Sequence, residues 1–163
     1  MAAMTQAHAI KPDVIRAYTS PTPFDAERIG AAALYCSDGR YGDQMDEFLH
    51  KALGLPRYDR VAAPGGGACL AGHSIAIREQ GAMDKQLRFL IAAHDLDRVV
   101  LIAHQDCGFY KQLKLWGKTI EEQQRLDLAK TAALVRGYAS GLTVDAYFAR
   151  KVDGRVRFER VEV

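Results

Sequence analysis

Two short stretches of this 163-residue chain contain side chains that bind transition metals. The first contains Cys36, Asp38 and Arg40, and the second contains His104 and Cys107. Thiolate and imidazole are common zinc ligands, and three protein ligands leave a fourth position for water, which separates a catalytic zinc from a closed structural one. The two stretches therefore predict an enzyme that binds zinc through Cys36, His104 and Cys107.

Each of these residues also has an ordinary structural explanation. A cysteine at a strand end can fill a small space in the core, and a buried histidine can be held by hydrogen bonds alone. Asp38 and Arg40 could form an ion pair at a turn, and that role would coexist with catalysis. The ordered combination of all five residues favours the metal site.

The segments before the two stretches explain how they could meet. Residues 29–35 and 99–103 are apolar runs that end directly before Cys36 and His104. If both runs are strands of a parallel sheet, the two stretches emerge at the same carboxyl edge. The alanines at 31–33 also suit a helix, but the polar turn that follows them favours a strand.

The rest of the chain alternates between helical and extended patterns. Helices are expected from Asp43 to Gly54, around residues 87–94, and from Glu121, where Leu128, Ala132, Val135 and Ala139 form an apolar face. Further strands are expected at 58–63, 143–149 and 156–163, the last two around an Asp153-Gly154 turn. This order predicts an α/β fold with a mostly parallel central sheet flanked by helices, and a C-terminal hairpin or edge strand.

Composition indicates one globular domain. Hydrophobic residues make up 48% of the chain, enough for a sizeable core. Residues 1–22 lack sustained periodicity and are expected to form an arm or a loosely attached segment, which leaves residues 23–163 as a single α/β domain. We find no internal repeat.

Charge and hydropathy argue against two classes of partner. The formal net charge is only +2 and the charged residues are dispersed, so no nucleic-acid surface is expected. No signal peptide and no apolar run of about 18 residues is evident, so no membrane partner is expected and the cytoplasm is the default location. In that reducing compartment, three cysteines are expected to be ligands or core residues rather than disulfides.

Other motifs have weaker interpretations. The Pro64-Gly65-Gly66-Gly67 loop lacks the ending of a phosphate-binding loop, so a tight turn or a close backbone approach is favoured over an anion cradle. Cys69 is expected to be a buried spare thiol. Phe109, Tyr110 and Trp116 could shape a pocket, although ordinary packing or a subunit interface is favoured.

The two motifs in this order resemble the β-class carbonic anhydrases. That family has Cys-x-Asp-x-Arg after one strand and His-x-x-Cys-Gly after another, which here match Cys36, Asp38, Arg40, His104 and the pair Cys107-Gly108. The resemblance covers about residues 29–163. It implies that zinc is bound by Cys36, His104 and Cys107, and that Asp38 either occupies the fourth position or pairs with Arg40.

The resemblance also implies an activity and an assembly. It implies reversible hydration of carbon dioxide to bicarbonate by zinc-bound hydroxide, in a homodimer or higher homo-oligomer. Asp38 and Arg40 would then be catalytic. Two alternatives remain open: the same centre acting on carbonyl sulfide or carbon disulfide, and a zinc-containing module that binds a small anion without turnover.

Overall fold

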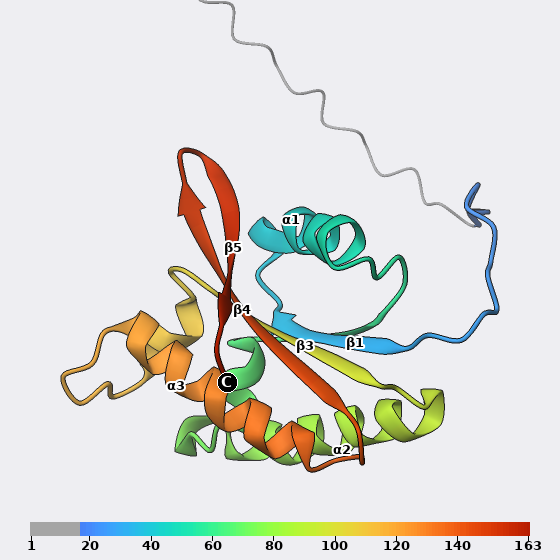
Figure 1. Ribbon diagram of the computed structural model, residues 1–163. Helices are drawn as coiled ribbons and strands as arrows, with labels where there is room; N and C mark the ends of the chain where they lie inside the picture. Colours follow the sequence, from blue (N-terminus) through green and yellow to red (C-terminus); the bar gives the residue numbers. More distant parts are fainter. Residues whose placement is uncertain (1–16) are drawn as a thin grey trace, which may run out of the picture.

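A five-stranded sheet organises residues 17–163, the part of the chain that the computed structural model describes (Figure 1). Its strands run in the order β2-β1-β3-β4-β5. They are β1 (Ala31–Cys36), β2 (Asp59–Ala63), β3 (Arg98–His104), β4 (Thr143–Val152) and β5 (Arg155–Val161). The first three pairings are parallel and the β4–β5 pairing is antiparallel. The predicted fold class is confirmed, and β5 is both the second strand of a hairpin and an edge strand.

Helices cover both faces of this sheet. The helix α1 (Gly42–Glu47) continues into a π-helical turn at Phe48–Ala52 and lies on one face, while α2 (Ile77–His94) and α3 (Ile120–Arg136) lie on the other (Figure 1). Because both faces are covered, central strands can be apolar along their whole length. All six residues of β1 are buried.

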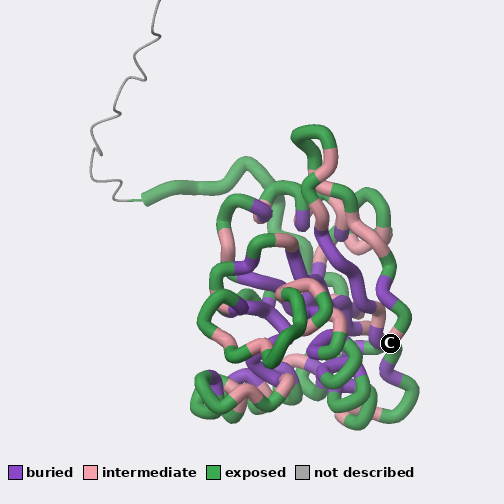
Figure 2. Tube along the Cα trace, turned by 90° about the vertical axis from the view of Figure 1, so that its left-hand side faces the viewer, coloured by how far each residue is buried: buried purple, intermediate pink, exposed green. Residues whose placement is uncertain are grey.

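The core is therefore divided into two layers by the sheet. Leu34 and Leu101 pack towards α2 and α3, whereas Ala33 and Ile102 pack towards α1. The strands are buried through the middle of the molecule, and residues 17–28 are exposed (Figure 2). The predicted arm at 1–22 falls mostly on residues 1–16, which lie outside the described residues. No helix in the described part of the chain is long and apolar enough to cross a membrane.

Local sequence explains where the last elements begin and turn. Thr119 caps α3: its hydroxyl accepts a hydrogen bond from the Glu122 N–H at 3.2 Å, and the Glu122 carboxylate accepts one from the Thr119 N–H at 2.7 Å. Asp153 and Gly154 both have positive φ, of 48° and 73°, as expected for a tight two-residue hairpin turn. The Asp153-Gly154 turn confirms the hairpin expected from the sequence, whereas the helix begins at Ile120, one residue before the expected Glu121.

The glycine-rich loop lies against the end of β1. Gly66 has a φ of +56°, and a Cβ atom placed there would lie 2.9 Å from the carbonyl carbon of Tyr35 and 3.0 Å from the backbone nitrogen of Cys36. Only a glycine allows the two backbones to approach so closely. The close approach predicted for this loop is confirmed.

Replacing Gly66 by alanine is therefore expected to destabilise the protein by about 2 kcal/mol or more, because the new methyl group meets backbone atoms in a strained conformation. Gly72→Ala is the matched control, since Gly72 also has positive φ (+86°) but open space around it. Urea unfolding monitored by circular dichroism measures both. Equal losses of unfolding free energy in the two variants would show that the close approach contributes nothing.

Candidate metal centre

Parallel pairing of β1 with β3 brings the two sequence motifs together. Tyr35 is the register partner of Ile102, so both strands end at the same edge of the sheet with Cys36 and His104 near each other. Cys107 follows after a short turn and begins the 3-10 turn Gly108–Gln112. Three predicted ligands thus arrive from two adjacent strand ends.

The three side chains form one compact buried group. The ligand atoms of Cys36, His104 and Cys107 all lie within 4.8 Å of one another, and the two sulfur atoms are 3.8 Å apart. Cys107 is 1% exposed and His104 is fully buried. The cysteines are reduced, because the sulfur separation is far beyond a disulfide bond.

Hydrogen bonding orients the His104 ring towards its partners. Its Nδ1 lies 2.8 Å from the backbone oxygen of Gln105, which can only accept, so Nδ1 carries the proton and Nε2 carries a lone pair. Nε2 is buried and has no hydrogen-bond partner among the described residues. A buried acceptor without a partner is costly, and a metal ion would satisfy it.

The donor set fits zinc. In a tetrahedral site, Zn–S bonds of about 2.3 Å separate the two sulfur atoms by about 3.8 Å, which matches the distance found here. Two thiolates and one imidazole complete three of four positions, the pattern of a catalytic rather than a structural zinc site.

The two thiols titrate as a pair. Hydrogen bonding with Cys107 lowers the pKa of Cys36 despite its burial, and the nearby backbone of Gly65 and Asp38 lowers it further. The same contact with Cys36, together with burial, raises the pKa of Cys107. One negative charge is therefore shared by the two sulfur atoms, and a divalent cation favours loss of the second proton.

Asp38 is held by Arg40. A 3-10 turn at Gly39–Tyr41 folds the arginine back, so that its Nε donates to Asp38 Oδ1 at 2.9 Å and its Nη2 donates to Oδ2 at 2.5 Å. Hydrogen bonding from Arg40 lowers the pKa of Asp38 to about 2. The structure thus places Asp38 beside Arg40 as an ionised carboxylate, outside the compact group of Cys36, His104 and Cys107.

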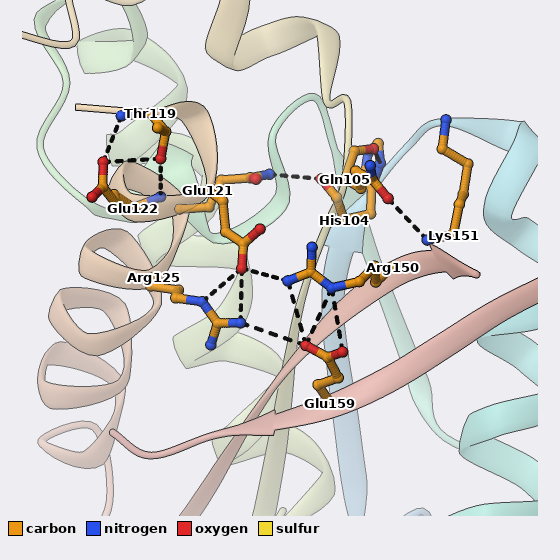
Figure 3. A network of polar contacts seen from close by, with 10 residues as sticks. His104, Gln105, Thr119, Glu121, Glu122, Arg125, Arg150, Lys151 and Glu159 are labelled. Carbon is orange, nitrogen blue, oxygen red and sulfur yellow. Dashed lines mark hydrogen bonds and ion pairs between the residues drawn. The ribbon is translucent and has the colours of Figure 1, made fainter. Parts of the chain in front are cut away.

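Residues that the motifs do not include support His104. The ring of Tyr41 lies 4.3 Å from the His104 ring, and its hydroxyl donates to the Gln105 backbone oxygen at 3.0 Å. The side chain of Gln105 accepts from the Lys151 backbone N–H at 3.0 Å (Figure 3). One feature of the sequence indicated that Tyr41 belongs to the site, namely its position directly after Arg40.

The remaining sequence candidates have different positions. Cys69 is buried and its thiol donates to the Pro64 backbone oxygen at 3.4 Å, as expected for a spare thiol. Tyr110 is buried in the same small cluster as Cys36 and Cys107. Phe109 packs against Gly65, where a Cβ atom would lie 2.7 Å from its ring, and Trp116 is exposed.

A group of ion pairs holds α3 against the C-terminal hairpin (Figure 3). Glu121 and Arg125 of α3 contact Arg150 of β4 and Glu159 of β5. The Arg150–Glu121 distance is 2.5 Å and the Arg150–Glu159 distance is 3.2 Å. Both arginines also lie about 5 Å from the Phe148 ring centroid. The end of α3 nearest the metal centre is thereby fastened to the sheet.

Comparisons with known proteins agree with this geometry. A family model described as "Putative carbonic anhydrase" matches residues 26–162. A comparison with curated protein sequences finds no match.

Solved structures with a similar fold include several carbonic anhydrases. The β-carbonic anhydrase isoform I of Trichomonas vaginalis is 16% identical, with 85% of this chain and 87% of that chain covered and a TM-score of 0.52. The β-carbonic anhydrase CafD of Aspergillus fumigatus is 11% identical, with 86% and 94% covered and a TM-score of 0.52. The carbonic anhydrase of Glaciozyma antarctica is 15% identical, with 80% and 81% covered and a TM-score of 0.50. The structural similarity shows a shared fold, and because the family model spans most of the sequence, the chain belongs to the carbonic anhydrase family, with the β-class fold that its two motifs predicted.

Proposed function

We propose that this protein catalyses the reversible hydration of carbon dioxide to bicarbonate at a zinc ion held by Cys36, His104 and Cys107. The observation that carries the proposal is the buried group of Cys36, His104 and Cys107: their ligand atoms lie within 4.8 Å of one another, and the spacing of the two sulfur atoms suits tetrahedral zinc. Within residues 17–163, the buried Nε2 of His104 has no hydrogen-bond partner. Membership of the carbonic anhydrase family supports the reaction.

The residues of this chain have separate roles in the proposed reaction. Zinc held there supplies Lewis acidity, which makes a water molecule nucleophilic near neutral pH. Asp38 remains ionised because Arg40 donates to both carboxylate oxygens, so it accepts a hydrogen bond and orients the attacking oxygen. Ligation of the metal by Asp38 would require this carboxylate to give up both of its hydrogen bonds from Arg40.

Two pockets flank the strand ends, and we assign them to the substrate and the product. One, of about 480 Å³, is lined mostly by apolar residues, among them Ala63, Met83 and Phe109, together with one glutamate and two glutamines, and it suits a neutral molecule such as carbon dioxide. Ala63 is the register partner of Cys36. The other, of about 260 Å³, is lined by Arg40, Lys151 and Arg155 and by one carboxylate, Asp106, which pairs with Lys151 at 2.6 Å. The excess of positive charge suits an anion such as bicarbonate.

Cys107→Ser is expected to abolish zinc retention and carbon dioxide hydration together, because serine is a poor zinc ligand. Cys69→Ser is the matched control: this thiol is equally buried but lies outside the ligand group, so its variant should retain about one zinc per chain and the wild-type rate. Metal analysis and stopped-flow hydration on the same preparations measure both quantities.

Hydration indistinguishable from buffer on fully zinc-loaded wild-type protein would contradict the proposed enzyme and favour a zinc-containing module. Zinc retained by the Cys107→Ser variant would contradict the ligand set.

Asp38→Asn is expected to leave zinc bound but to lower the hydration rate about 10- to 100-fold, since the carboxylate acts on the attacking oxygen without binding the metal. Glu47 is the last residue of α1, and its exposed carboxylate pairs with Lys51. The control variant Glu47→Gln removes this carboxylate and should leave the hydration rate unchanged. Unchanged hydration by the Asp38→Asn variant would remove Asp38 from the mechanism.

The Asp38 pKa also predicts the pH dependence. Because this pKa is lowered to about 2, the Asp38–Arg40 pair stabilises the fold at neutral pH, and that stabilisation disappears as the pH falls from about 4 to 2. The difference in unfolding free energy between the wild type and Asp38→Asn should therefore shrink as the pH falls from 7 towards 2, as measured by urea unfolding. A difference that stays constant over this range would contradict this.

We further propose a cytoplasmic homodimer or higher homo-oligomer. A reducing compartment keeps both ligand cysteines available for zinc. Ile77 and Trp116 are 69% and 84% exposed, and large apolar side chains of this kind are typical of subunit contacts. Sedimentation equilibrium is expected to give at least twice the 18.0 kDa chain mass, and a single-chain mass at micromolar concentration would refute the assembly.

A further inference from the structure

The buried face of α3 carries three polar side chains among its apolar ones. Gln124 and Asp127 are each 1% exposed and Thr131 is fully buried, although the neighbouring Leu128 and Val135 pack in the core as expected. Burying polar groups lowers stability unless each one makes hydrogen bonds. Their partners therefore indicate what these three residues do.

Gln124 contacts the segment that carries His104. Its side-chain Nε2 donates to the backbone oxygen of His104 at 2.8 Å. The backbone on either side of the His104 side chain is thereby fixed, because the Gln105 oxygen already accepts from the His104 ring. The side-chain oxygen of Gln124 has no partner among the described residues, so the contact with His104 is the one hydrogen bond that this buried amide makes.

Thr131 contacts the glycine-rich loop. Its hydroxyl donates to the backbone oxygen of Gly67 at 2.8 Å, and both residues are buried. The preceding Gly66 lies against the peptide bond before Cys36. Thr131 therefore holds the loop that supports Cys36.

Asp127 contacts the segment that follows Cys107. Its carboxylate accepts hydrogen bonds from His73 Nε2 at 2.6 Å and from Gln123 Nε2 at 2.9 Å. The ring of His73 in turn packs edge-on against the ring of Tyr110, and burial together with the nearby Asp127 carboxylate raises the pKa of the Tyr110 hydroxyl. Tyr110 lies in the 3-10 turn that Cys107 begins, and its backbone N–H donates to the Cys107 oxygen at 3.2 Å. Asp127 thus joins the turn after Cys107 to the segment around His73.

We propose that Gln124, Asp127 and Thr131 are positioning residues that set the arrangement of the three zinc ligands from a single helix. Each of them holds a different segment of the centre, and the helix is itself fastened to the sheet by the Glu121–Arg150 ion pair (Figure 3). This inference rests on the proposed zinc site. A rigid helix that supports all three segments keeps the ligands in one geometry whether or not the ion is bound.

The experiment compares metal binding in two variants that change shape little. Gln124→Met removes the amide and keeps the length of the side chain, and Thr131→Val removes the hydroxyl alone. Each is expected to raise the zinc dissociation constant about tenfold or more, measured by competition with a chelator. Each should also change the position and intensity of the visible bands of the cobalt-substituted protein, which report on ligand geometry.

Two further variants separate positioning from general destabilisation. Thr131→Ser keeps the hydroxyl that Thr131→Val removes, so this variant should have the zinc dissociation constant and the cobalt spectrum of the wild type. Val135→Ala removes buried apolar volume one turn further along α3, so it should lower the melting temperature without changing either metal readout. Tyr110→Phe removes only the hydroxyl near the Asp127 carboxylate, and it provides a test of Asp127 that preserves the ring packing.

The outcomes distinguish this inference from the proposed function. A wild-type protein that binds no zinc would refute the proposed function before any variant is compared. A wild-type protein that binds zinc, with Gln124→Met, Thr131→Val and Tyr110→Phe less stable but unchanged in zinc affinity and cobalt spectrum, would overturn the positioning role alone.

Discussion

The parallel pairing of β1 with β3 is the constraint on which the metal centre depends. Residues far apart in sequence become neighbours because two strands that run in the same direction end at the same edge of the sheet. Cys36 ends one strand, and His104 ends the other. The register that pairs Tyr35 with Ile102 sets where the two strands end relative to each other, so it also sets how close Cys36 lies to His104.

Backbone groups near this edge complete the centre. The glycine-rich loop approaches the end of β1 closely because Gly66 has no Cβ, and the Gln105 carbonyl selects the ring nitrogen of His104 that carries the proton. Neither role depends on a reactive side chain. Arg40 has a comparable role for Asp38, since it keeps that carboxylate ionised and correctly oriented near the zinc ligands.

Much of this arrangement could be predicted from the sequence, because the signals were local. Continuous apolar runs predicted β1 and β3, and an Asp153-Gly154 turn predicted the last hairpin. The strand order could not be predicted from periodicity, since it depends on contacts between distant segments. Asp38 remained ambiguous because its position depends on the turn that brings Arg40 back to it.

The polar residues of α3 were missed for a related reason. The helical pattern correctly identified Leu128, Ala132 and Val135 as buried, although Ala139 lies beyond the end of the helix. Gln124 and Thr131 share that face, but a polar residue on an apolar face has no predicted partner until the loops are in place. Their hydrogen bonds to His104 and Gly67 are tertiary contacts that no local pattern contains.

X-ray absorption spectroscopy at the zinc edge of the loaded protein is the most direct test of this description of the centre. It should give two sulfur neighbours at about 2.3 Å, one imidazole nitrogen at about 2.0 Å and one further light atom. A first shell without sulfur, or with one sulfur atom only, would show that Cys36 and Cys107 do not hold the ion together.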